Sequence, residues 1–212
     1  MKSSFIHSEK IQAGKFRKAK ATINTFISTI EKISSVTSEK YKQLPLNFVR
    51  IQTVEMDMII EKAAPDFTLF DTEKKQQSLS DYRDKKVLLL FFPLAFTSVC
   101  TAELCDVRDT LKKYEALNVQ PIGISVDSLY TLARYKQEQN LNFPLLSDFN
   151  KDVSTAYGVL YQAFGYGMKG VSKRAAFIID EGGIIQYAEV LENASHQPNF
   201  IAIEVKLREL AG

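Results

Sequence analysis

Residues 86–92 form an apolar run of strand length, six apolar side chains after Lys86, and Pro93 ends it. A continuous run of this kind is typical of a strand buried on both faces of a sheet, and proline cannot donate to a strand ladder. Residues 98–114 follow with apolar side chains three and four positions apart, which indicates a helix. A buried strand that leads directly into an amphipathic helix predicts an α/β sheet protein.

The same alternation continues to the end of the chain, so we expect one α/β domain over residues 58–212. Its last two strands should form a hairpin across Glu181-Gly182-Gly183. The further elements expected are a strand at 119–126, a helix at 129–139, an extended segment at 144–146, a short helix at 152–157, strands at 175–179 and 184–188, and a closing helix at 199–210.

The first 57 residues differ in charge, with ten Lys and Arg against five Asp and Glu, whereas residues 58–212 carry seventeen against twenty. Apolar residues at helical spacing predict a weak amphipathic helix around 16–34. We expect residues 1–57 to be a basic extension, helical or disordered. It is either an organellar transit peptide or an ordinary extension, such as one added by a start codon upstream of Met56 or Met58.

Charge, hydropathy and cysteine count exclude several classes of protein. Residues 58–212 have no Arg-rich stripe interleaved with aromatic residues, so nucleic acid is not an expected partner. No uncharged apolar run reaches the roughly 18 residues of a membrane span. Two cysteines five residues apart suit a reducing compartment, and with only two remote histidines they lack zinc-ligand spacing. We therefore expect a cytoplasmic or organellar protein without a metal or cofactor.

Cys100 lies where the first turn of the predicted helix 98–114 follows the buried strand. The free N–H groups and dipole of a helix start favour an anion, and the thiolate is the nucleophilic form of cysteine. Thr97, three residues earlier, brings a hydroxyl near the sulfur or caps the helix. Pro93 is expected to shield the site from the strand side. By itself this pattern indicates either a reactive thiol or a small buried hydrophobic residue.

The spacing Pro93-x3-Thr97-x2-Cys100 at a strand-to-helix junction resembles the active-site motif of the peroxiredoxins. Further segments that carry the resemblance are Ala64-Pro65-Asp66-Phe67, residues 144–148, residues 156–159 and residues 174–185. The resemblance implies a thioredoxin-like fold, with a central mixed β-sheet flanked by helices. It also implies a thiol-dependent peroxidase for hydrogen peroxide and organic hydroperoxides, with Cys100 as the peroxidatic cysteine and Thr97 and Arg174 completing the peroxide pocket.

Two charged residues are candidates for supporting the thiolate. Arg174 opens the predicted strand of the hairpin, and a guanidinium near a thiolate both favours its ionised form and stabilises charge that develops on peroxide oxygens. Lys173 should point to the opposite face, because side chains alternate along a strand. Glu103 is a carboxylate that can pair with an arginine, either at the site or as a structural residue.

Cys105 lies five residues after Cys100 on the same predicted helix. On an intact helix their Cα atoms are about 8.6 Å apart, whereas a disulfide requires about 7 Å or less. A bridge between them therefore needs local unwinding. Cys105 is either an inert thiol or the resolving cysteine, as in the bacterioferritin-comigratory branch of the peroxiredoxins, which this spacing resembles. No cysteine follows in 106–212, so an inert Cys105 would leave resolution to an external thiol.

The resemblance implies a peroxide as substrate and thioredoxin, glutaredoxin or a low-molecular-weight thiol as reductant, and it allows a homodimer. Two other functions compete with a peroxidase on the same fold. A thiol–disulfide oxidoreductase is disfavoured because the sequence has no Cys-x-x-Cys. A redox-idle chaperone or interaction module is disfavoured because Pro93, Thr97, Cys100 and Arg174 are all present.

Overall fold

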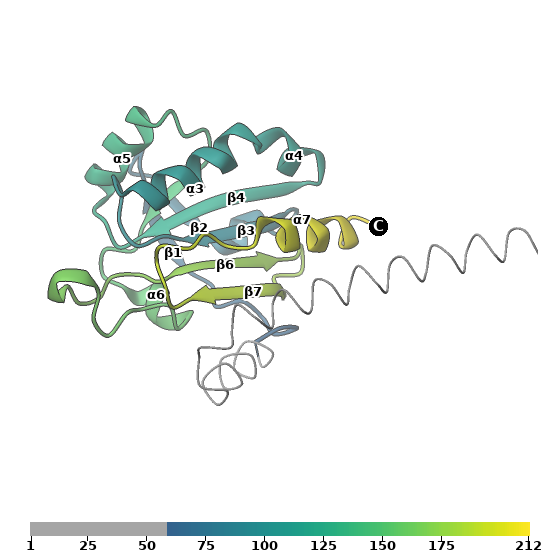
Figure 1. Cartoon of the computed structure of the whole chain (residues 1–212). Helices are drawn as coiled ribbons and strands as arrows, with labels where there is room; N and C mark the ends of the chain where they lie inside the picture. The colour runs from purple at the N-terminus through teal and green to yellow at the C-terminus, as the bar shows by residue number, and fades with distance from the viewer. Residues whose placement is uncertain (1–58) are drawn as a thin grey trace, which may run out of the picture. The chain divides into compact units, whose positions relative to one another are not determined.

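The computed structural model describes residues 59–212, which form one seven-stranded mixed sheet (Figure 1). The strand order is β2-β1-β5-β4-β3-β6-β7. The strands are β1 Thr68–Asp71, β2 Gln76–Ser78, β3 Lys86–Phe91, β4 Val119–Ser125, β5 Leu145–Ser147, β6 Arg174–Ile179 and β7 Ile185–Leu191. The helical elements are η1 Leu79–Tyr82, α3 Ser98–Asp109, α4 Leu111–Ala116, α5 Leu129–Glu138, α6 Asp152–Ala156, η2 Gly165–Gly167 and α7 Phe200–Glu209.

Strand β3 lies near the middle of the sheet, between β4 and β6, and all six of its residues are buried. It runs parallel to β4 and antiparallel to β6, and β4 runs parallel to β5. The parallel pairs are joined by helical crossovers, as parallel connections require. The continuous apolar run at 86–92 thus correctly predicted a strand that is covered on both sides.

Alternate side chains of β3 belong to two hydrophobic cores, one on each face of the sheet. Leu88 and Leu90 pack with apolar residues of α3, α4, α5 and α7, and Figure 1 shows the first three of these helices together over the sheet. Val87 and Leu89 pack on the other face, under η1, α6 and the loops around them. Burial on both faces explains why the strand has no polar alternation.

The expected single helix at 98–114 is in fact two helices, α3 and α4, separated at Thr110. The Thr110 side-chain hydroxyl donates to Asp106 O at 2.7 Å, and its backbone leaves the helical region at φ −107° and ψ 10°. A threonine that bonds the carbonyl four residues earlier bends or ends helices. The spacing of apolar residues gives no sign of this break, because Tyr114 of α4 packs in the same core as the apolar residues of α3.

The β1–β2 hairpin was not predicted from the sequence. Its strands are short and mostly polar, so they lack an apolar run. The buried carboxylate of Asp71 holds the turn instead, because it accepts hydrogen bonds from Glu73 N, Lys75 N and Gln77 Nε2. A turn of this kind depends on one side chain and leaves no periodic signal.

The β6–β7 hairpin turns where it was expected, and β7 continues to Leu191 rather than ending at Ala188. Gly183 has a φ of +80°, a conformation that glycine adopts without a steric penalty. The Asp180 carboxylate accepts from Gly182 N and Ile184 N across the turn.

Residues 1–57, including the helix predicted at 16–34, lie outside the described residues, so that part of the domain prediction stays a prediction. Within residues 59–212, no helix combines the length and apolarity needed to cross a membrane.

Candidate active site

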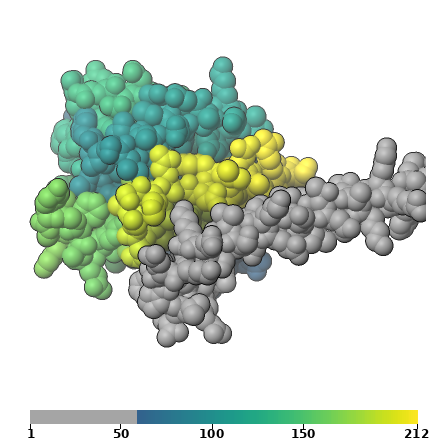
Figure 2. Space-filling view, in the orientation of Figure 1, coloured from purple at the N-terminus to yellow at the C-terminus, as the bar shows by residue number. Residues whose placement is uncertain are grey.

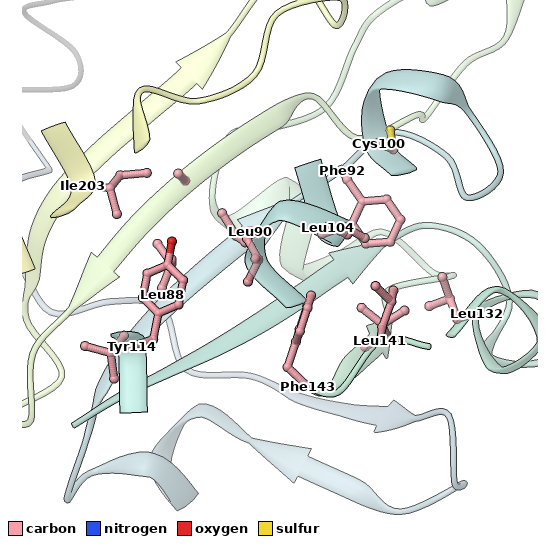
Figure 3. Packing of buried hydrophobic residues seen from close by; sticks show 14 of the residues in the cluster. Leu88, Leu90, Phe92, Cys100, Leu104, Tyr114, Leu132, Leu141, Phe143 and Ile203 are labelled. Atoms are coloured by element: carbon pink, nitrogen blue, oxygen red, sulfur yellow. The ribbon is translucent and has the colours of Figure 1, made fainter. Parts of the chain in front are cut away.

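Cys100 occupies the first turn of α3, and Thr97 is the N-cap residue of this helix. The loop that leads from β3 to α3 is therefore only a few residues long. The Cys100 side chain is 1% exposed and belongs to the core between the sheet and α3. Figure 3 shows Cys100 beside Phe92 at one end of this cluster, with Leu88 and Tyr114 toward the other end. The helix start thus places a buried thiol at the edge of the core.

Arg174 reaches the sulfur from the neighbouring strand. It is the first residue of β6, and β6 pairs with β3 so that Ala175 lies opposite Phe91. The Arg174 side chain is 1% exposed, and its Nη2 donates to Cys100 Sγ at 3.2 Å and to Ala194 O at 3.0 Å. A guanidinium fixed in this way can stabilise a thiolate and a second negative charge beside it.

Glu103 is fully buried one turn after Cys100, and Arg174 Nη1 donates to its Oε2. Burial raises the pKa of Glu103 to about 7, and the charge of Arg174 opposes this rise only in part. Burial also acts to lower the pKa of Arg174, but Glu103 and Cys100 outweigh it, so the pKa of Arg174 is raised and the guanidinium stays charged.

Two atoms of this ion pair have no hydrogen-bond partner among residues 59–212. Glu103 Oε1 and Arg174 Nε are buried without a hydrogen-bond partner in the part of the chain that the structure describes. An unsatisfied buried polar atom is costly, so its presence beside a reactive group is typical of a functional site.

Thr97 and Pro93 lie on the loop between β3 and α3. Thr97 is exposed, and its hydroxyl donates to Leu94 O at 2.9 Å rather than to the backbone of α3. The helix N-cap position is therefore occupied by Thr97 without a side-chain capping bond. Pro93 is buried directly after Phe92, and its carbonyl accepts a long bond of 3.5 Å from Ser125 Oγ.

Sequence reasoning missed the residue that fastens this loop. Asp127 Oδ2 accepts from Ala95 N at 2.7 Å and from the buried Ser125 Oγ at 2.9 Å. One carboxylate just beyond β4 accepts both hydrogen bonds. It therefore ties the loop between β3 and α3 to β4, the parallel neighbour of β3. Polar residues at the carboxyl end of a buried strand were the available signal, since parallel sheets place their sites there.

Cys105 lies on the same uninterrupted helix as Cys100, and both thiols are free. Cys105 is half-buried, and its Sγ approaches Gln139 Oε1 of the segment after α5 at 3.9 Å. The Lys173 ammonium pairs with Glu192 and lies 5.9 Å from the centre of the Tyr161 ring.

The sequence model of the AhpC/TSA family matches residues 60–188. The chain belongs to this family, the peroxiredoxins. This membership confirms the predicted thioredoxin-like fold and the predicted thiol-dependent peroxidase activity. The family reduces peroxides with electrons from thioredoxin-type reductants, and homodimers are common in it.

Individual peroxiredoxins match over most of the described residues. The chloroplastic 2-cysteine peroxiredoxin of Chattonella marina var. antiqua is 39% identical over 146 residues, which cover 64% of this chain and 72% of that protein. The reduced 2-Cys peroxiredoxin of Plasmodium vivax superposes with a TM-score of 0.63 at 31% identity, over 72% of this chain and 81% of that one. The peroxidoxin BcpB of Mycobacterium tuberculosis superposes with a TM-score of 0.64 at 27% identity, over 71% of this chain and 97% of that one.

Proposed function

We propose that Cys100 is the peroxidatic cysteine of this peroxiredoxin and that Arg174, Thr97 and Pro93 complete its peroxide pocket. The observation that carries the proposal is the buried contact of 3.2 Å between Arg174 Nη2 and Cys100 Sγ at the start of α3. It joins a cation and a thiol that lie 74 residues apart in the sequence. Glu103 acts through Arg174 by holding its other terminal nitrogen.

In the first step the Cys100 thiolate attacks one oxygen of the peroxide. A sulfur–oxygen bond forms and the oxygen–oxygen bond breaks, so the sulfur loses two electrons and becomes a sulfenic acid. The leaving oxygen takes a proton and departs as water or an alcohol. Arg174 is placed to stabilise the charge on both oxygens while the bond between them breaks. Thr97 contributes a hydroxyl at the rim that can accept from a peroxide O–H.

In the second step we propose that Cys105 resolves the sulfenic acid. The Cys105 thiolate attacks the Cys100 sulfur, a disulfide forms, and hydroxide leaves and takes up a proton to give water. Both cysteines lie on α3, where their Cα atoms are about 8.6 Å apart in a regular helix. The first turns of α3 must therefore unwind. Thioredoxin, glutaredoxin or a low-molecular-weight thiol would then reduce the disulfide.

The proposed substrates are hydrogen peroxide and organic hydroperoxides. Support for the organic class comes from Tyr161, whose ring centre lies 5.2 Å from that of Phe164 and 5.9 Å from the ammonium of Lys173, the residue before Arg174. An aromatic pair beside the start of β6, where Arg174 lies, offers apolar surface for an alkyl group. We further propose a cytoplasmic protein, or an organellar one if residues 1–57 are a transit peptide, which can form a homodimer.

Intact mass after one equivalent of hydrogen peroxide tests both steps. The wild-type protein should lose two hydrogens, and Cys105→Ser should instead gain one oxygen. Cys100→Ser should gain nothing. An oxygen adduct on the wild-type protein with no disulfide would make Cys105 inert and leave resolution to an external thiol, while an oxidised Cys100→Ser would overturn the assignment of Cys100. Peroxide turnover without reduction of insulin disulfides separates a peroxidase from an oxidoreductase.

A further inference from the structure

Tyr135 of α5 contacts the first half of α3 and the active-site loop. Its side chain has no exposed surface, and its hydroxyl donates to Thr101 Oγ1 at 3.1 Å. Its ring meets the ring of Phe96 edge to face, with centroids 5.0 Å apart. Phe96 is half exposed and has a φ of +63°, a strained conformation for a bulky residue. One tyrosine therefore supports the residue after Cys100 and a strained residue of the loop before it.

The acceptor of the Tyr135 hydroxyl, Thr101, lies between Cys100 and Cys105 in the sequence of α3. Burial raises the pKa of Tyr135 to about 12, its bond to Thr101 opposes the rise, and the charges of Cys100 and Cys105 both add to it. Any motion that brings Cys100 to Cys105 takes place beside Tyr135.

The second half of α3 is attached to the end of α5 by separate contacts. Arg108 Nη1 donates to Gln139 O at 2.6 Å, and Asn142 Nδ2 donates to Arg108 O at 3.3 Å. Cys105 Sγ approaches the side chain of the same Gln139. Helix α5 thus holds α3 at two places, through Tyr135 near Cys100 and through Gln139 near Cys105.

We propose that Tyr135 is a positioning residue that latches the first turns of α3, so that it sets how fast oxidised Cys100 leaves the peroxide site to reach Cys105. The attachment at Gln139 keeps the Cys105 end in place, and Cys100 is the residue that travels. This inference rests on the proposed role of Cys105. It assigns Tyr135 no part in the attack on peroxide, which needs α3 folded and the contact with Arg174 intact.

The bond between Tyr135 and Thr101 slows formation of the Cys100–Cys105 disulfide and keeps the peroxide site folded. Unwinding breaks the bond between Tyr135 and Thr101 and frees Phe96. Loss of one buried hydrogen bond should raise the unwound population about fivefold, which corresponds to about 1 kcal/mol. A weaker latch should therefore speed disulfide formation, and it should spare the sulfenic acid from a second peroxide.

The test is Tyr135→Phe, which removes only the hydroxyl. Tyr157→Phe is a matched control, because the hydroxyl of the largely buried Tyr157 donates to Pro65 O at 2.9 Å and its ring packs in the core on the other face of the sheet. Rapid-quench mass measurements give the rate of sulfenic acid formation and the rate of disulfide formation separately. Tyr135→Phe should leave the first rate within about twofold and raise the second about fivefold, and Tyr157→Phe should change neither.

Thr101→Val removes the acceptor from the other side and provides a second variant if Tyr135→Phe folds poorly. It should speed disulfide formation by a similar factor, and the double variant should be no faster than either single one. Disulfide formation at the wild-type rate in both variants would overturn the proposed role of Tyr135 and leave Cys105 as the resolving cysteine.

A wild-type protein that forms no disulfide would overturn the proposed roles of both Tyr135 and Cys105. If Tyr157→Phe forms the disulfide as fast as Tyr135→Phe, the effect is general destabilisation and the role of Tyr135 is overturned.

Discussion

At the scale of single residues, the proposed chemistry depends on one sulfur and one guanidinium. Replacing Cys100 by Ser keeps the size of the buried side chain but substitutes a hydroxyl that is hardly ionised at neutral pH. We expect peroxidase turnover to fall below about 1% of wild type, with a cooperative unfolding transition retained. Steady-state peroxide consumption and thermal unfolding measure the two outcomes. Turnover of a few per cent or more in Cys100→Ser would rule out Cys100 as the nucleophile.

Arg174→Lys keeps a positive charge but loses the fork that reaches Cys100, Glu103 and Ala194 with two nitrogens. A lysine cannot replace those contacts, so the second-order rate with hydrogen peroxide should fall on the order of 10²-fold. Stopped-flow measurement under single-turnover conditions gives this rate. Lys173→Met removes the neighbouring cation as a control and should stay within about threefold of wild type, and equal losses in both variants would contradict a specific role for Arg174.

Glu103 makes stability depend on pH in a definite direction. Its pKa is about 7 in the folded protein, above its ordinary value of 4.5, so between these values the folded state holds a proton that the unfolded state has released. That stabilisation is complete below about pH 4.5 and is lost as the pH rises toward and through about 7, on the order of 3 kcal/mol in total. We expect the free energy of unfolding of wild type to fall relative to Glu103→Gln across this window in urea titrations. Parallel pH profiles for the two proteins would contradict the raised pKa.

At the scale of elements, the loop between β3 and α3 is held by the carboxylate of Asp127. Asp127→Ala removes the acceptor of Ala95 N and the nearer acceptor of Ser125 Oγ, and the loss of these two bonds should cost about 1 to 3 kcal/mol. The second-order rate with peroxide should fall about tenfold or more, because a small displacement of the reacting groups slows a reaction strongly. Asp71→Ala is the control, because it removes a carboxylate that accepts several hydrogen bonds in the β1–β2 turn. It should lower the free energy of unfolding but leave the peroxide rate unchanged.

At the scale of the whole molecule, residues 59–212 contain a central strand covered on both faces and two cores of their own. The C-terminal helix α7 completes one of them: it lies beside the segment of α3 and α4 (Figure 2), with Leu207 and Tyr114 lining a shared cavity of about 190 Å³. A protein truncated to residues 58–212 should therefore unfold cooperatively and keep peroxide turnover within about twofold of the full chain. Circular dichroism and turnover measure this. A truncated protein that fails to fold would show that the domain boundary predicted at 57/58 is wrong.

The sequence by itself determined the α/β class, the central strand and the position of Cys100 at a helix start. These features are local: an apolar run bounded by Pro93 and a cysteine at a helix start are readable from neighbouring residues. Similarity to a known motif supplied Thr97 and Arg174, which no periodicity indicates. The β1–β2 hairpin and the break at Thr110 escaped prediction because each depends on one side-chain hydrogen bond.

Only the tertiary structure decided which groups surround the sulfur. The antiparallel pairing of β3 with β6 brings Arg174 to Cys100, and the parallel pairing of β3 with β4 brings Asp127 to the loop. The packing of α5 on α3 brings Tyr135 to Thr101. Contacts between residues more than 30 positions apart follow from strand order and helix packing, which the sequence encodes only through the whole fold. The burial that raises the pKa of Glu103 arises in the same way, because it requires α3 and β6 to close over the carboxylate.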